Sequence, residues 1–400
     1  MAWTKNTGTG YHQQDTDYYC GGATAQMILD SIGAGLLDQN VLYASNHSHN
    51  TQPGWATDPD GLAYTLRHYK PPAFTNTFVV YAKDTEVEGS QKIVYTLWKY
   101  NVSTGTLVFG CAHWIAVRGV SCDVEPVPGA TYTINGFWIN NPWPPSPSFY
   151  NPATAPPPPH SGADGCGTGG NRGIANEYVV YDPTWKDTYL TGCDVWGVGH
   201  KQYVSVVDPE PPRLGELSMK REEFWAKGDR LIESDEAMGL VFKGIDRHDL
   251  YQDELFAKAL EGAQPIRPIL VQRLDLPDTF YYLVPMARKR AVTAMLSIDG
   301  LYGNFRGGQV FVEPLRQPFV DRESVIKKVL SQPVELGEKL GKLIIREGAF
   351  CFYPIMVWRP CEESRSPYYP FYMITVGSRS IYIGYDGTIY PELHDIAPGG

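Results

Sequence analysis

Hydrophobic residues recur at helical spacing near the start of the chain. Ala23, Met27 and Ile28 fall on one side of a segment that runs from residue 20 to residue 32. Gly33 follows the last of these positions, and glycine commonly ends a helix. The pattern predicts a helix over 20–32 that begins at a cysteine.

Two more helices are expected before the pattern changes. One should begin at Asp58 and Pro59, a capping residue followed by proline in the first turn, and it carries Leu62 and Leu66 on one face. The other should cover residues 85–98.

Alternating and β-branched residues then replace the helical period. Residues 107–120 predict one or two strands, and residues 131–140 predict a hairpin with Asn135 and Gly136 in its tight turn. Helices followed by antiparallel strands define an α+β architecture.

Composition divides the chain into two parts. A proline-rich stretch at 142–160 and a glycine-rich run at 162–173 should form an extended insertion. A second proline-rich stretch at 208–214 follows an apolar segment and predicts a linker. The expected domains are therefore 1–207 and 215–400.

The second part contains an internal similarity. Three pairs of segments match in the same order, at separations of 86, 90 and 87 residues: 268–273 with 354–359, 281–284 with 371–374, and 298–300 with 385–387. We expect two copies of a small unit made of a helix and an antiparallel sheet. Two copies are too few for a solenoid, which needs about three.

Charge and hydropathy exclude some classes of protein. The formal net charge is -10, and no dense basic run is present, so nucleic acid is not the expected partner. No apolar stretch reaches the roughly 18 residues that a membrane span requires. The polar N-terminus lacks a signal core, which favours a cytoplasmic protein unless a signal has been removed.

The cysteine and histidine pattern predicts neither a disulfide framework nor a metal centre. Seven cysteines are spread thinly along the chain, so at least one thiol should be free. His47 and His49 lack neighbouring ligands and are expected in a solvated loop. We expect no cofactor and no metal.

The candidate nucleophile is the cysteine that starts the first helix. The N–H groups at a helix N-terminus carry partial positive charge and favour thiolate over thiol at Cys20. Gly21 and Gly22 allow close approach of a substrate. Gln14 lies six residues upstream and, with the Cys20 N–H, is a candidate oxyanion donor; Gln13 competes for this role.

The candidate base is His113, at the start of an apolar strand. It would need an acceptor to orient its ring. Asn141 follows the next strong strand, and Asn140 is its rival because the strand register is open at this stage.

The order Gln14, Cys20, His113, Asn141 resembles that of the papain-like cysteine peptidase superfamily. The strings Tyr-Tyr-Cys-Gly, His-Trp and Asn-Asn-Pro are most similar to bacterial peptidases related to the bacteriocin-leader-processing group. The resemblance covers about residues 10–205. It implies that Cys20 is the nucleophile, His113 the base, Asn141 the orienting residue and Gln14 the oxyanion donor. Those relatives usually have aspartate at the position of Asn141, and the transporter domains of true leader peptidases are absent here.

The resulting hypothesis is thiol-dependent hydrolysis of a peptide or protein substrate through an acyl-enzyme. The same residues would serve acyl transfer or deamidation, and a non-catalytic binding protein on a papain-like scaffold is the further alternative. The second domain would dock substrate or inhibit in cis.

Overall fold

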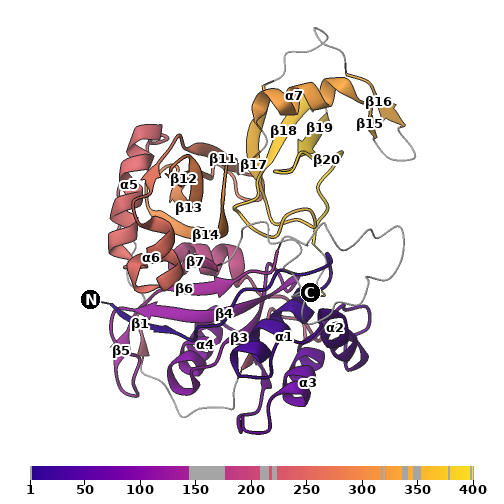
Figure 1. Cartoon of the computed structure of the whole chain (residues 1–400), viewed down its shortest axis with the longest axis vertical. Coiled ribbons are helices and arrows are strands. Elements are labelled where there is room, and N and C mark those ends of the chain that lie inside the picture. Colours follow the sequence, from indigo (N-terminus) through magenta and orange to yellow (C-terminus); the bar gives the residue numbers. More distant parts are fainter. Residues whose placement is uncertain are drawn as a thin grey trace.

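The computed structural model is a mixed α+β protein built on one large, mostly antiparallel sheet (Figure 1). It describes residues 2–143, 176–207, 216–218, 223–316, 319, 321–335, 341–345, 353–376, 379–396 and 399. The predicted insertion and linker lie almost entirely outside these residues.

The helices flank the sheet in separate groups along the chain (Figure 1). They are α1 Cys20–Ser31, α2 Gln39–Ser48, α3 Pro59–Tyr69, α4 Glu86–Tyr100, α5 Ser234–Arg247, α6 Glu254–Leu260 and α7 Arg322–Ser331, with the shorter elements η1 Tyr181–Tyr189 and η2 Leu250–Gln252.

Among the described residues, 16 strands join one sheet in the order β2-β8-β3-β4-β6-β7-β14-β13-β12-β11-β17-β18-β19-β20, with β1 paired to β4 and β10 to β12. Their bounds are β1 Trp3–Asn6, β2 Val79–Lys83, β3 Thr104–Val108, β4 His113–Cys122, β6 Ile134–Asn140, β7 Asn176–Val180, β8 Tyr203–Val207, β10 Gln264–Pro265, β11 Ile269–Arg273, β12 Phe280–Arg288, β13 Ala291–Asp299, β14 Phe305–Leu315, β17 Ile355–Trp358, β18 Phe371–Val376, β19 Arg379–Ile383 and β20 Ile389–Tyr390. Two short pairs stand apart, β5 Thr131–Tyr132 with β9 Glu216–Leu217, and β15 Val334–Glu335 with β16 Lys342–Leu343.

The three predicted helices are present with the expected starts. Cys20 opens α1, and the Asp58 side chain caps α3 by accepting from the Gly61 N–H. Thr85 caps α4 in the same way, accepting from the Glu88 N–H. Helix α2 was not predicted, and its last turn holds His47, which was expected in a loop.

The prediction of a tight turn at Asn135 and Gly136 is wrong. Both residues lie inside β6, where Gly136 pairs with Ser121 on one side and Val180 on the other. A Cβ on Gly136 would lie 2.5 Å from the Val179 carbonyl oxygen. The glycine is therefore used for close approach between strands rather than for a turn.

The sheet runs through both predicted domains. Strand β7 of the first part pairs antiparallel with β14 of the second, through Glu177 and Gln309 among others. Farther along, β11 and β17 lie side by side in parallel, and each begins a run of antiparallel strands. The internal repeat stays a prediction, since this arrangement alone does not establish two copies of one unit.

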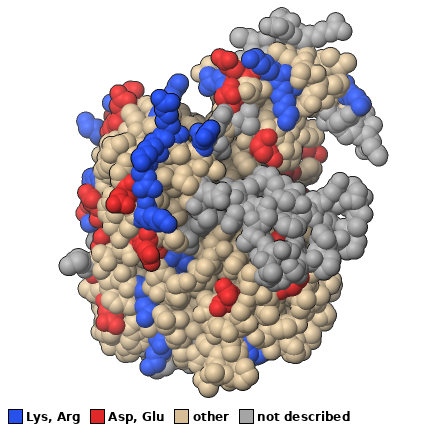
Figure 2. All heavy atoms as spheres, in the orientation of Figure 1, with Lys and Arg blue, Asp and Glu red and all other residues tan. Residues whose placement is uncertain are grey.

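Charges are unevenly distributed on the face that Figure 2 shows. Lys and Arg side chains gather on the upper left, with acidic side chains among them, and the lower part of that face carries few charges. No described helix is long and apolar enough to cross a membrane. The absence of a nucleic-acid partner stays a prediction from the charge.

A buried ion pair ties the first part of the sheet to the second part of the chain. Arg118 of β4 donates to Asp253 at 2.7 Å, and both side chains are about 2 % exposed. Asp253 also caps α6 and accepts from the Asn6 amide. One carboxylate thus connects β1, β4 and α6.

Replacing Asp253 with alanine should strongly destabilise the protein. Arg118 would be left as an uncompensated buried cation, at a cost of about 3–5 kcal/mol. Chemical denaturation measures this, with Glu233→Ala as the control, because its pair with Arg230 is exposed and should be worth about 0–1 kcal/mol. Equal destabilisation by the two variants would contradict the prediction.

Candidate functional site

The first residue of α1 meets the first residues of β4. Cys20 opens the helix, and no side chain caps this N-terminus. The backbone N–H of Trp114, the residue after His113, interacts with the Cys20 sulfur, as do those of Gly21 and Cys20 itself. The predicted nucleophile and base therefore come from two elements that touch.

Close packing at Gly21 shapes this junction. A Cβ there would lie 2.5 Å from the Thr57 side chain, so only glycine fits. The Thr57 carbonyl in turn accepts a hydrogen bond from the Trp114 indole at 2.8 Å. Thr57 thereby links the start of α1 to β4.

Asn141 holds the His113 ring. His113 Nε2 lies 2.8 Å from Asn141 Oδ1, and Trp143 N also donates to that oxygen at 3.1 Å. Asn140, its rival, points elsewhere and donates to the carbonyls of Thr9 and Gly10. The structure brings together the pair predicted first and excludes the rival from the histidine.

The hydrogen bonds around Asn141 set the tautomer of His113. Because Oδ1 is an acceptor, Nε2 carries the proton, and in a neutral ring Nδ1 then keeps its lone pair. Nδ1 is buried and has no hydrogen-bond partner among the described residues. The Cys20 sulfur and the ring are thus not hydrogen-bonded to one another in this arrangement.

The site is closed, and burial disfavours the charged forms of both Cys20 and His113. The Cys20 side chain is 0 % exposed, and this burial raises the pKa of its thiol, although Arg365 and the nearby N–H groups act in the opposite direction. Burial and the charge of Arg365 lower the pKa of His113 to about 3. Desolvation of the sulfur outweighs the helix end in this closed arrangement, and the expectation of a thiolate at Cys20 stays a prediction.

Gln14 bonds to the residue that follows Asn141, and its side-chain amide already donates to another carbonyl. Its backbone N–H donates to the Pro142 carbonyl at 3.0 Å, and its side-chain amide donates to the Thr16 carbonyl at 2.7 Å. Its side-chain oxygen is buried without a hydrogen-bond partner among the described residues. The oxyanion role of Gln14 stays a prediction. It would use the second hydrogen of the Gln14 side-chain amide, which does not bond to Thr16.

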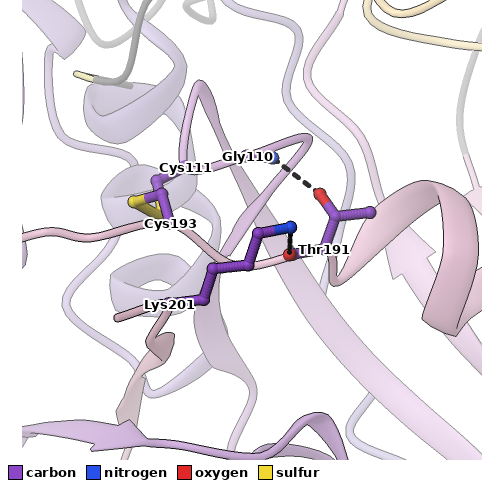
Figure 3. Close-up of a disulfide and its surroundings, with 5 residues drawn as sticks. All are labelled: Gly110, Cys111, Thr191, Cys193 and Lys201. Atoms are coloured by element: carbon purple, nitrogen blue, oxygen red, sulfur yellow. Dashed lines mark hydrogen bonds between the residues drawn. A yellow bond between two sulfur atoms is a disulfide. The ribbon is translucent and has the colours of Figure 1, made fainter. Parts of the chain in front are cut away.

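A disulfide braces the turn that leads into His113. Cys111 and Cys193 are bonded, and nearby Gly110 N donates to Thr191 Oγ1 at 2.8 Å (Figure 3). Lys201 Nζ donates to the Thr191 carbonyl in the same cluster. Disulfides are typical of oxidising compartments. The cytoplasmic location stays a prediction from the sequence.

The second part of the chain contributes Arg365, which the sequence did not indicate. Its carbonyl accepts from Asn141 Nδ2 at 3.1 Å, and its guanidinium lies over the Trp143 ring at 5.3 Å. It also donates to the Asp17 carbonyl at 3.4 Å. A loop between β17 and β18 thus reaches into the site and places a cation near Cys20 and His113.

Glu177 is a second residue that the sequence reasoning missed. It lies fully buried on β7 and accepts from Tyr189 at 2.7 Å and Ser366 at 3.3 Å. Burial raises the pKa of Glu177 to about 7, although hydrogen bonds from Tyr189, Ser366 and Asn141 act to lower it. The sequence signal for Glu177 is a single carboxylate within an otherwise apolar strand.

No cluster of three or more metal-ligating side chains occurs among the described residues. His47 Nδ1 instead lies 3.2 Å from the Trp55 carbonyl.

Comparison with known proteins assigns this chain to no family. No protein-family model, curated protein or solved structure matches the chain. The papain-like relationship therefore depends on the sequence motifs and on the site geometry, and it remains a proposal.

Replacing Glu177 with glutamine should change how stability depends on pH. A pKa raised in the folded state means that the folded protein holds a proton that the unfolded chain loses, so Glu177 makes stability fall as pH rises from about 4.5 to about 7. The glutamine variant should lose this fall, which amounts to about 3 kcal/mol.

Denaturation of both proteins at pH 5 and pH 8 measures the difference. Glu233→Gln, at an exposed position, is the control and should behave as wild type. The same pH dependence in all three proteins would show that Glu177 is not perturbed.

Proposed function

We propose that this protein is a cysteine peptidase in which Cys20 attacks the substrate and His113 is the general base. The observation that carries the proposal is the 2.8 Å contact of His113 Nε2 with Asn141, which leaves Nδ1 as the basic atom. The interaction of the sulfur with the N–H next to His113 supports it further. A cysteine at a helix start, a histidine and an orienting amide are the parts of a thiol hydrolase.

The reaction begins with a neutral thiol and a neutral imidazole. His113 Nδ1 takes the proton from Cys20 as the sulfur bonds to the peptide carbonyl carbon. The same proton then passes to the leaving amine as the C–N bond breaks, which yields a thioester. Water, deprotonated by His113, attacks the thioester; the C–S bond breaks, the acid product leaves and the sulfur regains a proton.

The developing oxyanion needs donors that point at it. The Cys20 N–H lies at an uncapped helix end and is suited to this role. Gln14 would provide the second donor through the amide hydrogen that Thr16 does not use. Because Cys20 is fully buried, a substrate can reach the sulfur only if the residues that cover it move.

Cys20→Ala and His113→Ala should each remove peptide hydrolysis. Either change takes away a group that forms or breaks bonds, so kcat/KM should fall by about 10³-fold or more. A peptide-library cleavage profile read by mass spectrometry measures this. Cys122→Ala is the matched control, because Cys122 is also a buried free cysteine on β4.

Wild-type hydrolysis that survives in Cys20→Ala would refute the proposal. The same mass spectra separate the related chemistries. Hydrolysis splits the peptide with addition of water, whereas deamidation changes the mass by about one dalton and acyl transfer joins two peptides.

Asn141→Ala should lower kcat and leave KM nearly unchanged. The hydrogen bond to His113 becomes stronger as the ring gains charge, so its loss should cost about 10- to 100-fold in rate. Asn140→Ala is the control, because its amide bonds to Thr9 and Gly10 instead. An equal loss of kcat in the two variants would exclude a specific role for Asn141.

A further inference from the structure

A buried chain of hydrogen bonds runs from His113 to Glu177. His113 Nε2 lies 2.8 Å from Asn141 Oδ1, and the Asn141 side chain is also hydrogen-bonded to Glu177. Since Oδ1 faces the histidine, the amide nitrogen Nδ2 is the atom that donates to the Glu177 carboxylate. All three side chains are fully buried. Asn141 therefore connects the candidate base to a carboxyl group on another strand, β7.

The charge of Glu177 bears on which way the Asn141 amide faces. An ionised carboxylate only accepts hydrogen bonds, so it holds Nδ2 toward itself and Oδ1 toward His113. A protonated carboxyl group also has a donor and tolerates the amide turned over, with Nδ2 toward the ring. The Trp143 N–H and the Arg365 carbonyl favour the first orientation, each at 3.1 Å. Ionised Glu177 thus reinforces the tautomer that leaves Nδ1 of the ring basic.

The same charge strengthens the base through the amide. Hydrogen bonds to ionised groups are roughly twice as strong as neutral ones, and hydrogen bonds in a chain polarise one another. A carboxylate at Glu177 therefore makes Asn141 Oδ1 a better acceptor. The better acceptor stabilises the positive charge that the His113 ring gains when it takes a proton.

Glu177 is the group of this chain that changes charge near neutral pH. Burial raises its pKa to about 7, and its partners across the sheet, Ile139 and Gln309, are uncharged. The Arg365 guanidinium, whose charge lowers the pKa of the ring at position 113, comes from the same loop as Ser366, which bonds to Glu177. Within the described chain, the titratable side chains that face Glu177 are tyrosines, and burial raises the pKa of each far enough to keep it neutral: Tyr11, Tyr189, Tyr368 and Tyr369.

We propose that Glu177 is a positioning residue for His113, which it orients and polarises through Asn141 without touching the substrate. The effect on rate rests on the proposed function, whereas the coupling of Glu177 to the ring does not. Hydrolysis should be faster when Glu177 is ionised. A change of pH near neutrality then acts on the site through a residue outside the catalytic pair.

Glu177→Gln should remove a rise of kcat/KM with pH. In the wild type, kcat/KM measured from about pH 5 to about pH 9 should rise about five- to tenfold through pH 7, as Glu177 loses its proton. Glutamine carries no charge, so the variant should stay at the low-pH level of the wild type.

Glu86→Gln is the matched control. Burial also raises the pKa of Glu86, and this carboxyl group likewise accepts from a serine and a tyrosine, Ser90 and Tyr181. Asn141 is not among its hydrogen-bond partners. The Glu86 variant should therefore keep the rise of kcat/KM seen in the wild type.

Nitrogen NMR of the His113 ring tests the coupling without hydrolysis. The ring signals are assigned by their loss in His113→Gln. Because burial and the charge of Arg365 lower the pKa of His113 to about 3, the ring does not gain a proton near neutral pH. Its Nδ1 and Nε2 signals should nevertheless shift with a midpoint near pH 7 in the wild type and not in Glu177→Gln.

Tyr189→Phe is a second variant that keeps the carboxyl group. The Tyr189 hydroxyl donates to Glu177 at 2.7 Å, so its loss should raise the pKa of Glu177 further. The midpoints of the ring signals and of kcat/KM should then both move to higher pH. A purely structural role of Glu177 would not move a midpoint, and this measurement holds even where glutamine at position 177 prevents folding.

Ring signals that stay constant near pH 7 in the wild type, or that shift equally in Glu177→Gln, would overturn the inference. The proposed function is judged separately. A ring titration that depends on Glu177, in a protein that hydrolyses no peptide, supports the coupling and refutes the peptidase. Hydrolysis with one pH profile in the wild type, Glu177→Gln and Glu86→Gln supports the peptidase and refutes the positioning role.

Discussion

The site depends on the register between β4 and β6. Pairing of Ala116 with Asn140 sets the position along β4 at which β6 ends, and the next residue, Asn141, then reaches the histidine that begins β4. Side chains alternate between the two faces of a strand, so a shift by one residue would exchange Asn141 and Asn140. Asn140 would then face His113, and the amide that bonds to Thr9 and Gly10 would be lost. The orientation of one imidazole is thus a consequence of how two strands pair.

Burial decides the charge state of the site more than the helix end does. The uncapped N-terminus of α1 and the cation of Arg365 both favour a thiolate at position 20, yet the pKa of the thiol is raised. The same burial lowers the pKa of His113. A helix terminus is worth about 0.3–1 kcal/mol at exposed positions, whereas desolvation of a fully buried ion costs several. Burial therefore favours the uncharged forms of both groups in this closed arrangement.

The second part of the chain contributes residues to the candidate site. Arg365 bonds to the amide that orients His113, and Ser366 bonds to Glu177 behind that amide. Gly399 is hydrogen-bonded to Thr57 and Cys111. The buried pair of Arg118 and Asp253 fastens the same two parts at another point of the sheet. These contacts join residues that lie more than 300 positions apart in the sequence, such as Asp17 and Arg365. Inhibition in cis and substrate docking by the second part both stay predictions.

Local sequence determined the elements that carry the candidate site residues. Helical spacing after Cys20, a cap at Asp58 and the alternation after His113 are short-range signals, and each predicted its element correctly. The choice between Asn141 and Asn140 depended on strand register, and the burial of Cys20 depended on packing from several elements. Asn135 and Gly136 had the composition of a turn, but the approach of β7 required a glycine inside a strand. Arg365 and Glu177 joined the site through contacts between distant segments, which no local pattern encodes. Tertiary structure decided these points because pairing and desolvation are properties of the assembled fold, whereas propensity and capping are properties of a few consecutive residues.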